Sequence, residues 1–334
     1  MIGRAPTKWH AAAAVLLVCL LAVLPLVASD FILSVLTSAF LYAVVGIAWN
    51  IMMGYAGQLS LGHALYFGTG AYVVAILSER FGVTPLIGMA PAFLLPAALG
   101  VAIGVLGFRF GVRGVYFALL TIAFAELARI LFEHWEWVGR SGGFFLSALT
   151  EANRPLVSLR GGAGFFYYAL LATMVVAWGA AAALVRSRYG FYWRAIREDE
   201  EAARAIGVEA FGMKLAAVAV SAGMTGVAGG WFALINGSLF PDTVLGMRLS
   251  IDLIIAPIVG GLGTLFGPIL GAFIVVPLNE LAKELAQSSG INGLNLLIYG
   301  VLLFIVVLVL PNGCWPWLEK LMQRIAERWR KEGP

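Results

Sequence analysis

Long apolar runs, separated by short polar stretches, make up most of this chain. A run of about 17–25 apolar residues is long enough to cross a lipid bilayer as an α-helix. By this criterion we expect ten spanning helices, at residues 11–28, 31–53, 59–78, 84–107, 114–132, 165–185, 215–236, 247–261, 264–285 and 294–310. The pattern therefore predicts an all-α, polytopic transmembrane helical bundle, in which residues 1–334 form a single domain.

The composition agrees with a membrane location. Hydrophobic residues make up 61% of the chain and charged residues 12%, which is about half the charged share of a typical soluble domain. At a mean hydropathy of +0.92, this much apolar surface cannot be covered within one water-soluble core. The net charge of +4 comes from Arg and Lys at segment ends and predicts no nucleic-acid partner. Two distant cysteines, Cys19 and Cys314, argue against a disulfide framework and against a metal site.

The first apolar run has two interpretations. Arg4 and Lys8 precede it, and residues 27–29 resemble a cleavage site, as in a secretory signal peptide. Its apolar stretch is longer than the usual core of a signal peptide. We therefore favour a retained membrane anchor, with a cleaved signal as the alternative.

The basic residues predict how the chain is oriented. Arg and Lys beside spanning helices are retained on the cytoplasmic side. The polar segment 186–214 contains six of them: Arg186, Arg188, Arg194, Arg197, Arg204 and Lys214. Six crossings from a cytoplasmic N-terminus return the chain to the cytoplasm at this segment, and the basic C-terminal tail prefers the same side. Both termini are therefore expected in the cytoplasm, which requires an even number of spans.

Segment 247–261 is the least secure of the ten spans. It is short, holds Arg248 and Asp252 near its start, and contains Pro257. A re-entrant half-helix there would leave the C-terminal tail outside, against the charge rule. If spans two to five and seven to ten form an inverted repeat, this segment is the counterpart of the span at 59–78, and a solute path would lie at the interface of the repeats.

The segment 186–214 is also predicted to contain a short surface helix. Two opposite-charge pairs at i,i+4, Arg197 with Glu201 and Glu200 with Arg204, would each stabilise it by about 0.2–0.5 kcal/mol. Three apolar residues fall near one face of this helix: Ile196, Ala203 and Ile206. Gly207 suits the helix end, where a left-handed residue is commonly needed. The alternative is a solvated cytoplasmic loop with ordinary ion pairs.

Two glycine-rich stretches lie in or beside predicted spans, at residues 54–72 and 260–271. Glycine lets helices pack closely, and it lets a helix unwind where backbone polar groups face a cavity. Polar side chains in a membrane normally face protein or water, so a solute path is one interpretation. Its candidate residues are Gln58, Ser60, Gly62, His63, Gly263 and Thr264. Tight packing is the other interpretation, and His63 by itself also fits a buried packing histidine.

Four segments, in order along the chain, are similar to one family. They read GQLSLGHALYFGTGAY from Gly57, GVYFALLTIAFAELARI from Gly114, RAIREDEEAARAIGV from Arg194 and GGLGTLFGPILGA from Gly260. The family is the M-type permease subunit of ABC importers for branched-chain amino acids and related small solutes. The chain departs from it at residues 141–145, which read Ser-Gly-Gly-Phe-Phe, where the family often has an acidic residue soon after Thr-Gly-Gly. The contact made there, and the substrate, are left open by this difference.

The resemblance implies a permease of the bacterial inner membrane for branched-chain amino acids or a related small polar solute. It would work in membrane lipid with a second homologous permease, two ATP-binding subunits and a periplasmic solute-binding protein, for which the external loop 133–164 is the expected docking surface. The pattern EAA-x-x-x-G resembles the cytoplasmic loop that docks on the ATP-hydrolysing subunit, with candidate coupling residues Arg197, Glu201, Ala202, Ala203 and Gly207. The chain has no G-x-x-x-x-G-K-[ST] motif, so we expect ATP to be bound by the partners and no cofactor or enzymatic activity in this chain.

An ion-coupled secondary transporter is the main alternative, because such proteins also use broken helices near the middle of the membrane. It would need a buried acidic residue, for which Glu126 and Asp252 are the candidates. Glu126 and Arg129 lie at i,i+3, however, and are expected to neutralise each other. A membrane-embedded enzyme is a weaker alternative, since no hydrolytic triad or metal cluster is recognisable in the sequence.

Overall fold

The computed structural model describes residues 20–146, 162–289, 294–311 and 313–332. The predicted all-α class is confirmed, since the described elements are helices apart from two short strands. In chain order the elements are η1 (Leu24–Leu26), α2 (Asp30–Trp49), η2 (Asn50–Tyr55), α3 (His63–Phe81), α4 (Pro85–Arg109), α5 (Val115–His134), η3 (Glu136–Val138), η4 (Arg140–Gly142), β1 (Phe144–Phe145), α7 (Ala163–Arg186), α8 (Arg188–Glu198), α9 (Glu200–Ala205), α10 (Ala210–Asn236), β2 (Ser238–Leu239), α11 (Pro241–Leu245), α12 (Met247–Gly260), α13 (Gly267–Ser289), α14 (Leu294–Val309) and α15 (Cys314–Glu332).

Among the described residues, six helical segments are long and apolar enough to cross a membrane. They are Asp30–Tyr55, Pro85–Arg109, Val115–His134, Ala163–Arg186, Ala210–Asn236 and Pro241–Gly260. Each matches a predicted span, and the last combines α11 with α12, which occupies the predicted span 247–261. The helices α3, α13 and α14 occupy three further predicted spans. Most of the predicted first span, 11–28, lies outside the described residues.

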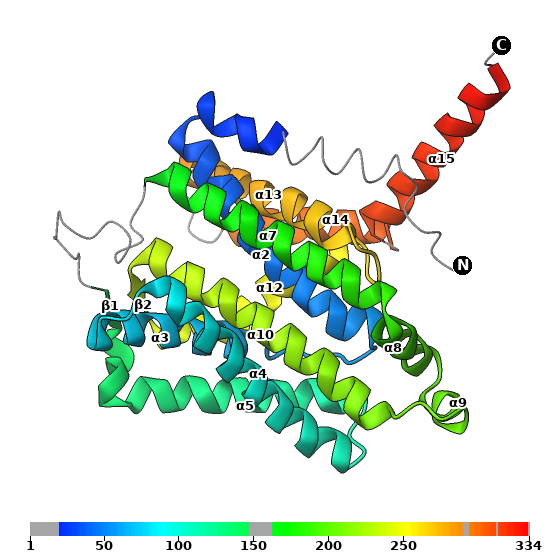
Figure 1. Ribbon diagram of the computed structural model, residues 1–334. Coiled ribbons are helices and arrows are strands. Elements are labelled where there is room, and N and C mark those ends of the chain that lie inside the picture. Colours follow the sequence, from blue (N-terminus) through cyan, green and yellow to red (C-terminus); the bar gives the residue numbers. More distant parts are fainter. Residues whose placement is uncertain (1–19, 147–161, 290–293, 312, 333–334) are drawn as a thin grey trace.

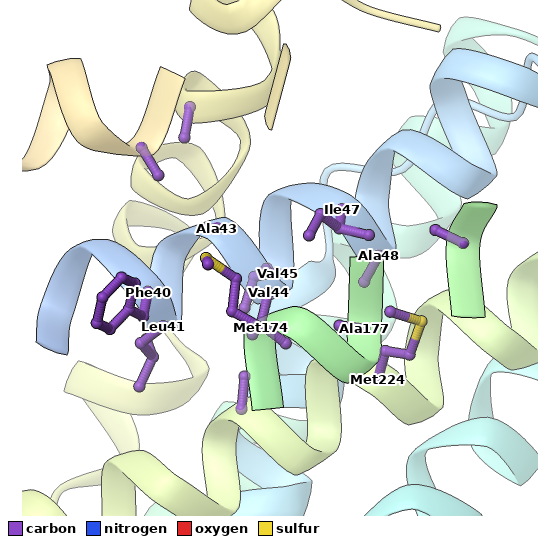
Figure 2. Packing of buried hydrophobic residues seen from close by; sticks show 14 of the residues in the cluster. Phe40, Leu41, Ala43, Val44, Val45, Ile47, Ala48, Met174, Ala177 and Met224 are labelled. Carbon is purple, nitrogen blue, oxygen red and sulfur yellow. The ribbon is translucent and has the colours of Figure 1, made fainter. Parts of the chain in front are cut away.

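The helix α2 forms the centre of the bundle because it is apolar on every side. It contacts α7, α10, α12 and α13. Phe40, Val44 and Ile47 of α2 share one buried cluster with Met174 of α7 and Met224 of α10, as Figure 2 shows. Burial continues through the π-helical segment η2, so the first glycine-rich stretch begins inside the protein.

Glycines allow α10 to pack closely against α3 and α4. A Cβ atom on Gly70 of α3 would overlap the backbone of Gly226 of α10, and a Cβ on Gly229 of α10 would overlap the carbonyl of Phe67 in α3. Such small residues permit close approach of two helix backbones. At Gly70, therefore, the packing interpretation of the first glycine-rich stretch holds.

The short strands and the α8–α9 segment lie at opposite ends of the bundle (Figure 1). At one end, η3, η4 and β1 come from the predicted external loop 133–164, and β1 pairs antiparallel with β2. Residues 147–161 of that loop lie outside the described residues. At the other end, α8 and α9 come from the predicted segment 186–214. The bundle therefore separates the two predicted docking regions by its full length.

Candidate functional site

The helices α8 and α9 meet at a sharp corner at Asp199. Its backbone is extended, and its carboxylate caps α9 by accepting hydrogen bonds from the backbone N–H groups of Glu201 (2.9 Å) and Ala202 (3.0 Å). An aspartate at this position is among the best helix N-caps. The predicted continuous helix with an Arg197–Glu201 pair is therefore wrong, because these two residues belong to different helices.

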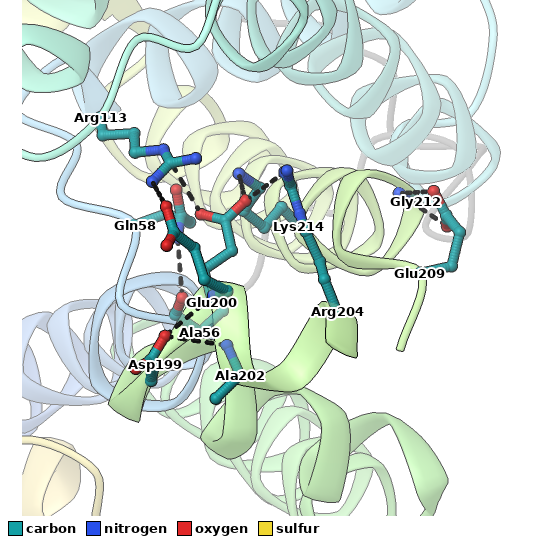
Figure 3. Close-up of polar contacts among 11 residues, drawn as sticks. Ala56, Gln58, Arg113, Asp199, Glu200, Ala202, Arg204, Glu209, Gly212 and Lys214 are labelled. Carbon is teal, nitrogen blue, oxygen red and sulfur yellow. Dashed lines mark hydrogen bonds and ion pairs between the residues drawn. The ribbon is translucent and has the colours of Figure 1, made fainter. Parts of the chain in front are cut away.

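The second predicted pair in this segment is confirmed, and it belongs to a larger cluster. The Glu200 carboxylate accepts hydrogen bonds from Arg204 (2.5 Å) and from Lys214 of α10 (2.9 Å), and Arg113 lies 3.8 Å away (Figure 3). The Lys214 side chain is only 3% exposed, and its Nζ lies 4.6 Å from the centre of the Phe108 ring. This cluster fixes α9 to the start of α10 and to the α4–α5 connection.

The electrostatics of the Glu200 cluster favour a charged carboxylate. Burial by itself would raise the pKa of Glu200, but the hydrogen bond from Lys214 and the charges of Lys214 and the nearby guanidinium groups hold the pKa below its ordinary value. The direction of the shift means that Glu200 stays ionised at neutral pH. The ion pairs that position α9 are therefore present throughout the physiological range.

Gly207 ends α9 in the left-handed conformation, with φ of +88°. The N–H of Gly207 bonds to the carbonyl of Arg204 (2.9 Å), and the N–H of Val208 bonds to the carbonyl of Ala203 (3.0 Å). These two bonds form a Schellman motif, which satisfies carbonyls left free at a helix end. An added Cβ on Gly207 would meet no atom within 4 Å, so the backbone conformation, and not space, requires glycine here.

The α9 segment presents a small exposed surface. Glu201, Ala202, Ala205 and Ile206 are exposed, with Ile206 at 80%. The predicted ridge of Ile196, Ala203 and Ile206 is wrong in part, because the first two are buried together with Ala210 while Ile206 faces outward. We call the exposed set Glu201, Ala202, Ala205, Ile206 and Gly207 the α9 surface.

Arg197 links α8 to both glycine-rich stretches. Its Nη1 donates a hydrogen bond to the carbonyl of Gly54, and an added Cβ on Gly263 would lie 2.9 Å from the same nitrogen. Gly57 packs against the Arg197 side chain, so that a Cβ there would lie 2.9 Å from Cγ. Gly57 and Gly263 both have positive φ, +70° and +71°. We call this meeting point of Gly54, Gly57, Gly263 and Arg197 the glycine junction.

Asn50, the first residue of η2, closes the glycine junction, although no sequence motif singled it out. Its side-chain amide donates to the carbonyl of Thr264 (2.8 Å), and its oxygen accepts from the N–H of Gly263 (2.8 Å). The residue is 3% exposed and lies at the end of an otherwise apolar span. Asn50 could have been identified from the sequence as a candidate, since a polar side chain in a membrane span normally faces protein or water.

The helix α3 starts later than predicted, at His63, because residues 59–62 are not helical. Side chains from distant helices bind this segment and the first turn of α3: the Thr121 hydroxyl accepts from the N–H of Leu61 (3.1 Å), and the Ser250 hydroxyl accepts from the N–H of Ala64 in α3 (2.8 Å). The indole N–H of Trp49 donates to the carbonyl of Ser60 (2.8 Å). These partners replace the hydrogen bonds that a continuous helix would provide.

His63 is fully buried, and both nitrogens of its ring lie within hydrogen-bond distance of a hydroxyl group. Its Nδ1 lies 3.1 Å from the Ser60 hydroxyl, and its Nε2 lies 3.0 Å from the Ser221 hydroxyl of α10. Two hydroxyl groups can satisfy both nitrogens of a neutral imidazole. This arrangement joins the unwound segment to α10.

The six candidate path residues fall into two groups. Ser60, Gly62 and His63 are buried, and a Cβ on Gly62 would overlap the carbonyl of Thr121. Gln58, Gly263 and Thr264 are partly exposed. Thr264 also caps α13, since its hydroxyl accepts from the N–H of Gly267 (3.0 Å). Asn50 binds Gly263 and Thr264 of the second group, whereas Trp49, the residue before Asn50, binds the carbonyl of Ser60 in the first group.

At the end of the bundle opposite α8 and α9, three carboxylates surround Arg129. It pairs with Glu126 (2.5 Å) and Glu133 on α5, and lies 3.7 Å from Asp242 of α11. The predicted pairing of Glu126 with Arg129 is confirmed. Within the described residues, no cluster of three His, Cys, Asp or Glu side chains suits a metal ion.

Comparisons with known proteins point to one family. The family described as the permease component of branched-chain amino acid transport systems matches residues 31–307. The high-affinity branched-chain amino acid transport system permease protein LivM of Escherichia coli is 28% identical over 321 residues, covering 87% of this chain and 72% of LivM. A probable branched-chain amino acid transport permease protein LivH of Methanocaldococcus jannaschii is 24% identical over 270 residues, covering 77% of this chain and 84% of that protein. No solved structure matches the chain.

Proposed function

The chain belongs to the family of branched-chain amino acid transport system permease components, and from this premise we propose that its α9 surface docks on an ATP-binding subunit. As a member of this family it is a multi-pass membrane protein and the permease component of an ABC transport system, with no catalysis of its own. The exposure of Glu201, Ala202 and Gly207 supports docking, while Ala203 faces inward and holds α9 in place.

Arg197 carries the signal from the docking surface to the membrane-spanning helices in this proposal. The observation that supports it most strongly is the contact of this one side chain with both glycine-rich stretches, at Gly54 and at Gly263. Movement of α8 and α9 on the ATP-binding subunit would pull on the ends of η2 and of α12 together. The coupling is thus mechanical and needs no nucleotide site in this chain.

The solute path runs beside the glycine junction. Gln58, Gly263 and Thr264, which are partly exposed, would face it, and a second homologous permease would supply the opposite wall. Ser60, Gly62 and His63 would hold the unwound backbone of the first stretch in place. Helix breaks with polar backbone commonly form such sites in transporters.

We also propose ten spans with both termini in the cytoplasm, and an inverted repeat of spans two to five and seven to ten. The course of α12 supports this number. Before it, β2 pairs with β1 at one end of the bundle, and just after it, Gly263 lies beside Arg197 of α8 at the other end. A segment that connects the two ends in this way fits a crossing better than a re-entrant half-helix.

The orientation can be tested with a cysteine at Lys331, in a chain whose Cys19 and Cys314 have been replaced. We expect Lys331→Cys to resist an impermeant maleimide in intact cells and to react after lysis, because the tail is cytoplasmic. A matched Phe145→Cys, exposed on β1, should react in intact cells. Reaction of Lys331→Cys in intact cells would place the tail outside and make 247–261 re-entrant.

The relatives support a proposal for the partners and the solute. The named functions of LivM and LivH support leucine, isoleucine and valine as the solutes, delivered by a periplasmic binding protein to the end formed by η3, η4 and β1. The bacterial inner membrane is the corresponding location. The alternative of an ion-coupled transporter is weakened by Glu126, whose carboxylate is already paired with Arg129.

Co-purification separates these two functions. A tagged chain, extracted from its own membrane in mild detergent, should bring down an ATP-hydrolysing subunit and a second permease. Uptake by the reconstituted complex should require ATP and remain when proton and sodium gradients are collapsed. A chain that purifies alone and transports with an ion gradient would establish the alternative.

A further inference from the structure

The last helix, α15, has a different character from the spanning helices. At 100° per residue, its sequence places apolar side chains on one half of the helix and polar ones on the other. The apolar half consists of Trp315, Trp317, Leu318, Leu321, Met322, Ile325 and Trp329. The polar half contains Lys320, Arg324, Arg330 and Lys331 together with Glu319, Gln323 and Glu327, whereas Arg328 falls between Trp317 and Leu321 on the apolar half. This pattern of aromatic and basic residues is typical of helices that lie in a membrane–water interface.

The start of α15 is fixed close to the membrane boundary. Only residues 310–313 separate it from the end of the apolar α14, and four residues span at most about 14 Å. Trp315 stacks on Phe266 in the α12–α13 connection, with 4.8 Å between ring centres, and a Cβ on Gly313 would overlap the backbone of Gly261. The first turn of α15 is therefore attached to the bundle at the level where the spans end.

The direction and exposure of α15 match a surface helix. In Figure 1, α15 leaves the bundle across the direction of α2 and α7 and does not continue along it. On its apolar half, Trp317, Leu321 and Met322 are 55%, 38% and 40% exposed. The part of the apolar half that the bundle leaves exposed, Trp317, Leu321 and Met322, is therefore free to contact a lipid boundary.

We propose that α15 binds the membrane surface, with its apolar half in the acyl–headgroup boundary and its basic residues on anionic lipid headgroups. The charges support the choice of lipid: α15 carries five basic and three acidic residues, a net charge of +2, and basic residues beside a membrane surface are attracted to anionic headgroups. The choice of the inner leaflet rests on the proposed topology, whereas the binding itself does not. Through Trp315 and Phe266, the lipid-bound helix would also fix the α12–α13 connection relative to the bilayer.

Spin-label accessibility in the full chain tests this proposal. Cys19 and Cys314 are first replaced. The nitroxide is then attached to a single cysteine, placed on the apolar half at Leu321 or Met322, or on the polar half at Lys320 or Gln323. The protein is placed in nanodiscs of phosphatidylcholine with phosphatidylglycerol. We expect Leu321→Cys and Met322→Cys to be the more accessible to oxygen, which partitions into lipid, and Lys320→Cys and Gln323→Cys to be the more accessible to a water-soluble nickel chelate.

Two further arms decide between lipid and other partners. In nanodiscs of phosphatidylcholine alone, the difference in reagent accessibility between the apolar and polar positions should decrease, because the anionic headgroups are missing. An unchanged difference would overturn the role of charge. Nickel access at all four positions would show a helix in water and overturn the proposal. Protection of the apolar positions from both reagents, appearing only when an ATP-binding subunit is added, would instead show a protein-binding face. Equal thermal unfolding of the four labelled proteins confirms that the labels leave the fold intact.

Discussion

Replacing Arg197 with alanine should reduce uptake by about 5- to 150-fold, the range that couplings of about 1–3 kcal/mol span, while the ATP-binding subunit stays attached. The reason is its position: Arg197 contacts Gly54 and Gly263 at the glycine junction but lies outside the α9 surface. The measurement is uptake of leucine by proteoliposomes, with ATP hydrolysis recorded beside it. ATP hydrolysis should persist while uptake falls, because the variant removes the link between hydrolysis and transport.

Two control variants make the Arg197 result specific. Arg188→Ala removes the same charge from an exposed position at the start of α8 and should transport normally. Arg197→Lys keeps the charge but loses the planar guanidinium, whose fixed N–H groups suit a carbonyl acceptor, and should recover uptake only in part. Normal uptake by Arg197→Ala would show that the glycine junction does not carry the coupling.

The second large effect is expected at the α9 surface, where Gly207→Asp and Glu201→Ala should abolish uptake by releasing the ATP-binding subunit. Gly207 has φ of +88°, a conformation that aspartate and asparagine both adopt more readily than most residues, so the charge that aspartate adds to the proposed contact is the expected cause of the loss. Glu201 presents 84% of its side chain to solvent. Association is measured by co-purification, and membrane insertion by the amount of chain in the membrane fraction.

The α9 experiment also has matched controls. Gly207→Asn adds no charge, and asparagine adopts the left-handed conformation more readily than most residues, so it should retain most of the association. Glu198→Ala removes a similarly exposed carboxylate, at 76%, which pairs with Arg197 at the end of α8, and should have little effect on association. A loss of binding in Glu198→Ala as large as in Glu201→Ala would mean that loop charge, and not the α9 surface, holds the partner.

The spanning helices could be predicted from the sequence because bilayer thickness sets their length. The non-helical segments between the helices could not be predicted in this way. Residues 59–62 look like the start of a span, yet they are not helical: the Thr121 hydroxyl binds the N–H of Leu61, and the Ser250 hydroxyl binds the first turn of α3 at Ala64, both from helices far along the chain. No pattern in the sequence around residues 59–62 predicts these hydrogen-bond partners. Asn50 was missed for the same reason, because its two bonds are to Gly263 and Thr264.

The coupling segment shows a different limit of sequence analysis. The spacing of Arg197 and Glu201 favours a helical ion pair, but the aspartate between them is also a strong N-cap, and in the structure capping determines the geometry. Breaking the helix at Asp199 frees Arg197 to contact the glycine junction. The helix break at Asp199, which the i,i+4 spacing did not predict, is thus the feature on which the proposed coupling depends.

The most direct test of this account is to measure subunit association and uptake side by side in Arg197→Ala and Gly207→Asp. We expect two different failures: Arg197→Ala keeps the ATP-binding subunit but loses most of its uptake, whereas Gly207→Asp loses the subunit and transport together. Loss of the subunit in both variants, or normal uptake in either, would contradict the assignment of docking to the α9 surface and of transmission to Arg197.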